Sequence, residues 1–147
     1  MDGSTANQRS TAAPLGGSFR RRHGAKALVT SGWRVLLVKE RHADGTVFWT
    51  LPGGGVERHE CPREGLAREL VEELRCRSRV GDSRSTFWYA HRSCEWTVTR
   101  YTLFDCTLLG TPTPNAAEGI EDARWVDPAD PPTRTLPQVR LVCERLA

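Results

Sequence analysis

Residues 53–76 read GGGVERHECPREGLARELVEELRC, a triple glycine followed by the clearest helical pattern in the chain. Pro62 suits the first position of a helix, and a leucine recurs at every fourth residue from Leu66 to Leu74. The pattern predicts a helix over residues 62–74 with one apolar face. An apolar face of this length needs a partner layer, so the rest of the chain is expected to build around it.

Acidic side chains occupy another face of the predicted helix. Glu69, Glu72 and Glu73 stand at positions i, i+3 and i+4, which brings them together. Like charges at this spacing destabilise a helix by roughly 0.2–0.5 kcal/mol per pair, and the negative end of the helix dipole also opposes them. Such a face is either solvated or used to hold a cation, and three carboxylates suit Mg²⁺ or Mn²⁺.

The triple glycine favours the cation. Glycine loses much backbone entropy on folding, so three in a row indicate a tight turn or a close approach to a ligand. The three glycines follow a predicted strand and end within ten residues of the helix. The backbone of Gly53 and Gly54 would therefore be free to approach a metal ion or a substrate phosphate.

The same segment resembles the Nudix box, Gly-x5-Glu-x7-Arg-Glu-U-x-Glu-Glu-x-Gly-U, in which U is an aliphatic residue. The match covers residues 54–76 and includes seven fixed positions: Gly54, Glu60, Arg68, Glu69, Leu70, Glu72 and Glu73. Two flanking stretches, residues 49–54 and 121–126, also resemble the family. Arg75 replaces the closing glycine and Cys76 the last aliphatic residue. The first change predicts strain at the helix exit if Arg75 is left-handed there.

The resemblance implies an α/β (α+β) Nudix fold, in which a mixed β-sheet is sandwiched between helices. It also implies a set of metal ligands, namely Glu69, Glu72, Glu73 and the carbonyl of Gly53. Arg68 would pin the glutamates by ion pairing, and Glu60 would support the loop or a second metal. Without the resemblance, Arg68 could be an exposed arginine, and Glu60 could simply complement the helix dipole.

Hydrolysis at such a site would need a proton acceptor. A metal ion lowers the pKa of a bound water, and a carboxylate then takes the proton. In the family this base comes from the box helix, here Glu72 or Glu73, or from a later loop. Glu118 is the loop candidate and Glu121 its alternative, and either could instead be a solvated loop acid.

Substrate contacts are expected from basic and aromatic side chains. Lys39 and Arg41 share one face at the end of a predicted strand, toward the glycine loop. They could hold distal phosphates or simply be exposed. Aromatic candidates to stack a base are Trp33, Phe48, Trp88, Tyr89 and Trp96. Aromatic residues at strand spacing more often belong to the core.

Weaker patterns organise the remainder of the chain. Strands are predicted over residues 26–30, 33–39, 47–51, 77–80 and 123–126, a hairpin over 86–91 and 95–109, and a helix over 138–146. Leu36 and Val38 should face one way, and Val35, Leu37 and Lys39 the other. Residues 1–24 have almost no apolar content and predict a disordered basic tail, which leaves a Nudix hydrolase domain over residues 25–147.

Charge and cysteine content narrow the possible partners. Residues 1–24 hold four arginines and one acid, which leaves 17 basic and 17 acidic side chains in the rest. A neutral domain argues against nucleic-acid binding. No apolar run approaches the roughly 20 residues that span a bilayer, so no membrane partner is expected. Five cysteines without a CxxC pair are typical of reduced thiols and favour the cytoplasm. The oligomeric state is not indicated.

These observations predict a Mg²⁺- or Mn²⁺-dependent hydrolase that cuts a phosphate–phosphate bond in a nucleoside diphosphate linked to another moiety. Nucleoside or deoxynucleoside triphosphates are the preferred substrates. One alternative is a nucleotide-binding regulatory domain without significant catalysis, against which the intact glutamates argue. Another is a hydrolase of capped RNA, against which the neutral domain argues, or of dinucleoside polyphosphates. Enzymes of the last class tend to show a tyrosine after the box, and Tyr89 is earlier than expected.

Overall fold

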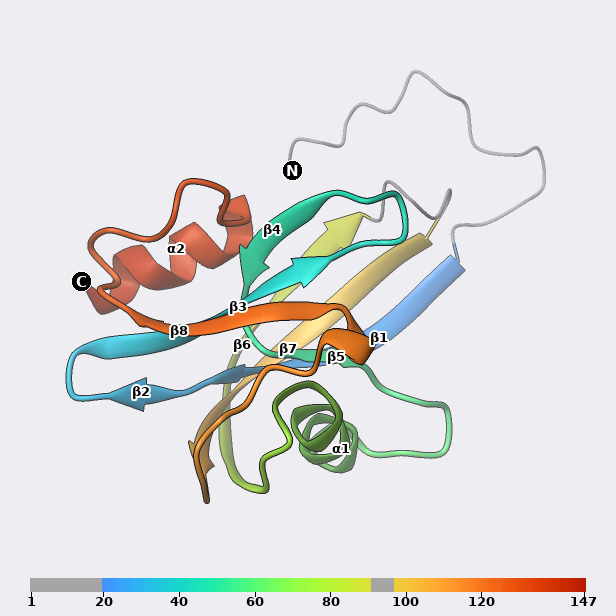
Figure 1. Cartoon of the computed structure of the whole chain (residues 1–147). Helices are drawn as coiled ribbons and strands as arrows, with labels where there is room; N and C mark the ends of the chain where they lie inside the picture. The colour runs from blue at the N-terminus through green and yellow to red at the C-terminus, as the bar shows by residue number, and fades with distance from the viewer. Residues whose placement is uncertain (1–19, 91–96) are drawn as a thin grey trace.

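Over residues 20–90 and 97–147, which the structure describes, the chain forms two β-sheets and two α-helices (Figure 1). The structure is a computed structural model. The elements are β1 (Arg20–Leu28), β2 (Thr30–Ser31), β3 (Arg34–Arg41), β4 (Val47–Thr50), β5 (Gly53–Gly55), α1 (Pro62–Leu74), β6 (Ser78–Ala90), β7 (Thr97–Leu108), the 3₁₀ turn η2 (Ala116–Glu118), β8 (Ile120–Val126) and α2 (Pro137–Leu146).

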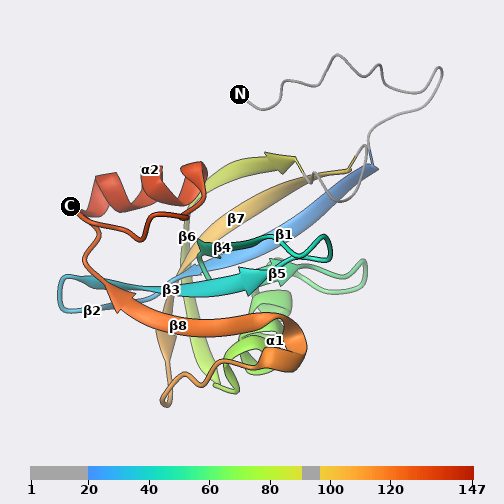
Figure 2. The ribbon, with the colours of Figure 1, turned by 45° about the horizontal axis from the view of Figure 1, so that its top comes forward.

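The first sheet has the order β5-β1-β7-β6, and the second places β3 between β4 and β8, with β2 beside it (Figure 2). β1 runs antiparallel to β5 and parallel to β7, while the long β6 and β7 form an antiparallel hairpin. The first sheet is therefore mixed, as the sequence predicted, whereas the strands of the second sheet pair antiparallel.

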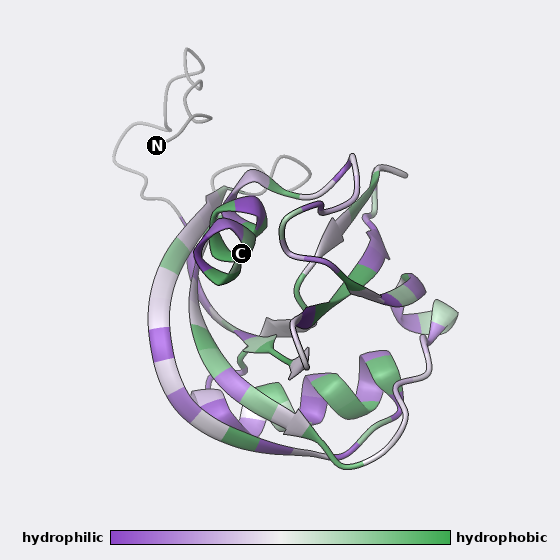
Figure 3. Cartoon of the chain, turned by 90° about the vertical axis from the view of Figure 1, so that its left-hand side faces the viewer, coloured by the Kyte–Doolittle hydropathy of each residue, from purple (hydrophilic) through white to green (hydrophobic). Residues whose placement is uncertain are grey.

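Strand β3 is covered on both faces, and this explains the position of the helices. Leu36 and Val38 pack in one cluster with the leucines of α1. Val35 and Leu37 pack in a second cluster with Val139 and Cys143 of α2. Figure 3 shows the two helices apart from each other on the inner side of the long curved strands, each with hydrophobic and hydrophilic residues. The predicted alternation along this strand and the predicted layered fold are confirmed.

Helix α1 spans Pro62–Leu74, the range that its leucine periodicity predicted. At its start, the Glu64 carboxylate accepts a hydrogen bond from the Cys61 N–H at 3.1 Å. At its end, Arg75 is left-handed with φ 53° and ψ 40°. The loop before β8 closes this end, because the Asn115 side-chain amide donates to the Glu72 carbonyl at 2.8 Å and also accepts from Arg75 at 3.1 Å.

Replacing Arg75 with glycine is expected to stabilise the protein by about 0.5–1 kcal/mol, because glycine adopts positive φ without a steric penalty. The loss of the exposed contact with Asn115 offsets part of the gain. A urea melt measures the change. As a control, Arg77→Gly, two residues further on and exposed, should bring no such gain. A lower midpoint for Arg75→Gly would contradict the strain.

The first strand begins before residue 25, the predicted start of the domain. β1 starts at Arg20, so residues 20–24 belong to the sheet and not to a tail that ends at residue 24. The reason is long-range pairing: Arg20 lies opposite Thr97 of β7, and Gly24 opposite Gly55 of β5. The first four residues of the strand are exposed and polar, so no apolar pattern announces them. The remainder of the predicted tail lies outside the described residues.

Two further expectations concern the chemistry of the chain. Cys61, Cys76, Cys106 and Cys143 are free thiols, as predicted, and Cys94 lies outside the described residues. Neither helix of the described part of the chain is long and apolar enough to cross a membrane.

Candidate functional site

The glycine loop is shaped by contacts that a side chain would block. Gly53 has φ 131°, and a Cβ there would collide with the Ala25 carbonyl and lie 2.9 Å from the Cα of Lys26. A Cβ on Gly54 would lie 2.5 Å from Oε1 of Glu69. Glycine at these positions therefore lets the loop backbone lie directly against β1 and the acidic face of α1.

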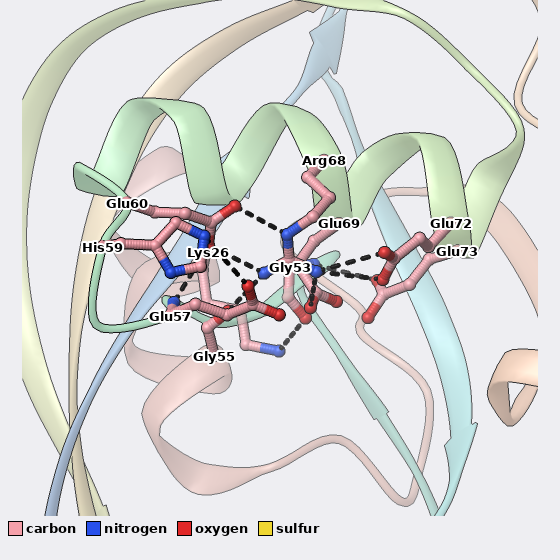
Figure 4. A network of polar contacts seen from close by, with 10 residues as sticks. All are labelled: Lys26, Gly53, Gly55, Glu57, His59, Glu60, Arg68, Glu69, Glu72 and Glu73. Carbon is pink, nitrogen blue, oxygen red and sulfur yellow. Dashed lines mark hydrogen bonds and ion pairs between the residues drawn. The ribbon is translucent and has the colours of Figure 1, made fainter.

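Arg68 is the centre of an ion-pair network (Figure 4). Its Nε donates to Glu60 at 2.7 Å, and its Nη1 lies 3.1 Å from both Glu69 and Glu72. Its Nη2 donates to the Gly55 carbonyl at 3.1 Å. The hydrogen bonds from Arg68 lower the pKa of Glu60 to about 2. One guanidinium thus fixes three carboxylates and the loop, which is the role that the box predicted for it.

Glu73 and Lys26 hold the two sides of Gly53. The Gly53 N–H donates to Oε1 of Glu73 at 3.0 Å, and its carbonyl accepts from Nζ of Lys26 at 3.1 Å. Both side chains are buried, with 6% of Glu73 and 5% of Lys26 exposed. A carboxylate from α1 and an ammonium from β1 therefore meet through one glycine, whose conformation they fix.

Burial governs the protonation of these groups. It raises the pKa of Glu73 to about 8, against the lowering effects of Lys26 and the Gly53 N–H. It also raises the pKa of Glu69. Burial alone would lower the pKa of Lys26, but Tyr101, Glu40 and Glu73 outweigh it and raise that pKa. For Glu73, the innermost carboxyl group, burial therefore outweighs the opposite charge of Lys26 and favours the neutral form.

A stability measurement tests the raised pKa of Glu73. Glu73 keeps its proton to about pH 8 when folded and loses it near 4.5 when unfolded, so folding stability falls between these values and then levels off. Glutamine still accepts from the Gly53 N–H and cannot ionise. In chelator, Glu73→Gln is therefore expected to gain a few kcal/mol over the wild type above pH 8 and little below pH 4.5.

Urea melts across this pH range measure the gain. Glu144→Gln, at an exposed position on α2, is the control and should track the wild type at every pH. A gain for Glu73→Gln that does not grow with pH would contradict the raised pKa.

The predicted glutamate ligands of the metal lie close together on α1. Arg68 binds Glu69 and Glu72, while Glu73 accepts from the Gly53 N–H and is also hydrogen-bonded to Glu69. Within residues 20–90 and 97–147, no three His, Cys, Asp or Glu side chains are gathered to hold a metal ion as they stand. The donors still suit a hard divalent cation in kind, because they are carboxylate and carbonyl oxygens.

The two loop acids differ in their surroundings. Glu118 is exposed in η2, and this turn lies against α1. Glu121 forms an ion pair with Arg41. Of the two, Glu118 remains the candidate proton acceptor from this loop, since Glu121 is already paired with a cation.

A cavity opens beside Lys26, between the two sheets and the start of α2. It is lined by Lys26, Glu40, His42, Phe48, Thr50, Phe87, Tyr89, Tyr101, Leu136 and Gln138. Two of the predicted aromatic residues, Phe48 and Tyr89, belong to this lining. Trp33 and Trp88 are exposed elsewhere, and Trp96 lies outside the described residues.

Lys39 and Arg41 are placed differently from the prediction. They line a separate groove with Trp49, Glu121 and Arg134, whereas the neighbouring Glu40 lines the cavity beside Lys26. Side chains alternate along β3, so these two cations lie across the strand from the cavity. Lys39 lies on the face of β3 that alternation predicted, but this face packs toward α2 and not toward the glycine loop.

The residues that sequence analysis missed are Lys26, Glu40 and Gln138. Lys26 carried a signal, because a single lysine in the apolar run Ala25 to Val29 demands a buried partner. Glu40 and Gln138 carried none, since their role depends on strands and a helix that meet only in the fold.

Comparisons with known proteins identify one matching family and several structures of similar fold. A family model described as the NUDIX domain matches residues 20–144. A MutT NUDIX hydrolase from Burkholderia pseudomallei has a TM-score of 0.76 at 22% identity, covering 87% of this chain and 99% of that chain. An ADP-ribose pyrophosphatase from Streptococcus suis has a TM-score of 0.61 at 20% identity, covering 84% and 90%. At these identities the likeness shows a shared fold. No curated protein matches the sequence.

Proposed function

The chain belongs to the Nudix family of hydrolases, and from this we propose that it cuts the phosphate–phosphate bond of nucleoside diphosphate derivatives with Mg²⁺ or Mn²⁺. The observation that carries the proposal is the buried Glu73 carboxyl group, fixed on the glycine loop beside a row of further carboxylates. The proposed ligands are Glu69, Glu72, Glu73 and the Gly53 carbonyl. When bound, the ion supplies charge neutralisation and an acidified water.

The chain's own residues supply the framework for this chemistry. Arg68 and Glu60 hold the acidic row against the loop. Gly54 is proposed to let a substrate phosphate approach the loop backbone beside Glu69. Glu118 is the proposed acceptor of the water's proton, with Glu72 as the acceptor within the helix.

The cavity beside Lys26 is proposed to receive the nucleoside. Phe48, Phe87 and Tyr89 provide ring faces for stacking, while Glu40 and Gln138 provide an acceptor and an amide for the edge of a base. The cavity lies next to the glycine loop, because Lys26 belongs to both. A nucleoside held there would direct its phosphates toward the glutamates, which suits a nucleoside or deoxynucleoside triphosphate.

A hydrolysis screen, in which chromatography separates each substrate from its products, tests the proposal. The panel comprises nucleoside and deoxynucleoside triphosphates, nucleotide sugars, ADP-ribose, dinucleoside polyphosphates and capped RNA, each with Mg²⁺, Mn²⁺ or excess chelator. Turnover is expected with a triphosphate, only when a divalent ion is present. Full turnover in chelator would overturn the metal's role, and turnover of another class alone would overturn the substrate.

A further inference from the structure

Lys26 places a positive charge inside the carboxylate cluster. The side chain comes from a buried position of β1, and its Nζ lies 3.1 Å from the Gly53 carbonyl and 5.1 Å from the centre of the Tyr101 ring. An ammonium removed from water in this way requires nearby negative charge. Glu40 and Glu69 supply it, each of them favouring the charged form of Lys26.

Lys26 donates its hydrogen bond to the Gly53 carbonyl oxygen, which has a role in the proposed function. The Gly53 carbonyl is a proposed ligand of the divalent ion, and Glu73, which binds the N–H of the same residue, is another. An ammonium and a divalent cation that share a carbonyl oxygen repel each other strongly where the dielectric constant is low. Carboxylates could screen two cations here, but Glu69 and Glu72 are already paired with Arg68.

We propose that Lys26 is the built-in counter-cation of this cluster, and that it competes with the divalent metal ion for the Gly53 carbonyl. The inference rests on the metal site of the proposed function. Metal binding then releases the ammonium, and the adjoining cavity offers it the Glu40 carboxylate as a new partner. The released ammonium faces the space proposed for the nucleoside, so metal and nucleotide binding are coupled through one side chain.

Nuclear magnetic resonance tests the competition directly, because the chain has only two lysines, Lys26 and Lys39. Protein labelled with ¹³C-lysine gives two ε-methylene signals, and Lys39→Arg assigns them. The ring of Tyr101 should shift the Lys26 signal upfield without metal. Saturating Mg²⁺ is expected to move this signal toward the usual lysine position and to leave the Lys39 signal in place.

The same titration separates this inference from the proposed function. A Lys26 signal that stays fixed while Mg²⁺ raises the melting temperature would overturn the competition and leave the metal site standing. No rise in melting temperature and no shift would overturn both. A shift of the Lys26 signal alone supports the competition.

Calorimetry of a variant gives a second measurement. Without the competing charge, Lys26→Met is expected to bind Mg²⁺ about tenfold more tightly than the wild type. Lys39→Met, which removes the other lysine from a separate groove, should bind as the wild type does. An unchanged affinity for a folded Lys26→Met would contradict the proposal. Should that variant fail to fold, the measurement on the wild-type protein still decides.

Discussion

Turnover is expected to fall on the order of 10²-fold or more when Glu72 or Glu73 is replaced by glutamine. Glutamine keeps the shape of the side chain and one acceptor oxygen, but it lacks the charge that holds a hard divalent ion. Glu73→Gln also keeps its acceptor for the Gly53 N–H, so the loop should retain its conformation. The measurement is kcat at saturating Mg²⁺ on the best substrate of the screen.

Glu144→Gln is the matched control, because it removes a carboxylate from an exposed position on α2, the helix that does not carry the acidic row. It should retain wild-type kcat. Circular dichroism and melting curves establish that the two variants of the box are folded. Near-normal turnover in both would remove the catalytic role of the box and favour the nucleotide-binding regulatory domain.

Gly53→Ala is expected to destabilise the protein by roughly 3–5 kcal/mol, or to prevent folding. The conformation at φ 131° is open almost only to glycine, and the new Cβ would meet backbone atoms of Ala25 and Lys26, which no rotamer change can move aside. Strand β5 would have to separate from β1, and the Gly53 carbonyl would leave Lys26. A urea melt measures the loss of stability.

Gly45 provides the control for this substitution. It also has a positive φ, 87°, but a Cβ there would meet nothing within 4 Å. Gly45→Ala should therefore cost about 1 kcal/mol, from backbone strain alone. Equal losses for the two variants would show that strain, and not the contact with β1, accounts for the glycine at position 53.

The sequence predicted best where the cause is local. The limits of α1 follow from Pro62 and the leucine period, and the left-handed turn at Arg75 follows from its place at the end of the box. The ion pairs of Arg68 were expected too, since they form within one helix and its preceding loop. The predicted ligand residues remain proposals, as does the role of Glu118.

Predictions failed where distant segments meet. The start of β1 at Arg20 depends on β7, and the surroundings of Lys39 depend on which helix covers each face of β3. The apolar residues around Lys26 in the sequence predict that it is buried, but they do not predict that it contacts Gly53. The cavity beside Lys26 combines side chains from five strands, from the loop after β3 and from the start of α2, so only the fold could assemble it.

The parallel pairing of β1 with β7 also limits the order in which the strands can fold during synthesis. Arg20 pairs with Thr97 and Leu28 with Asp105, so every pair joins residues 77 positions apart. Contacts of such long range slow folding, because the entropy of closing the loop is lost before the contacts form. On the ribosome, about two thirds of the chain must emerge before β1 gains its parallel neighbour, and until then the apolar face of α1 lacks a complete sheet to cover it.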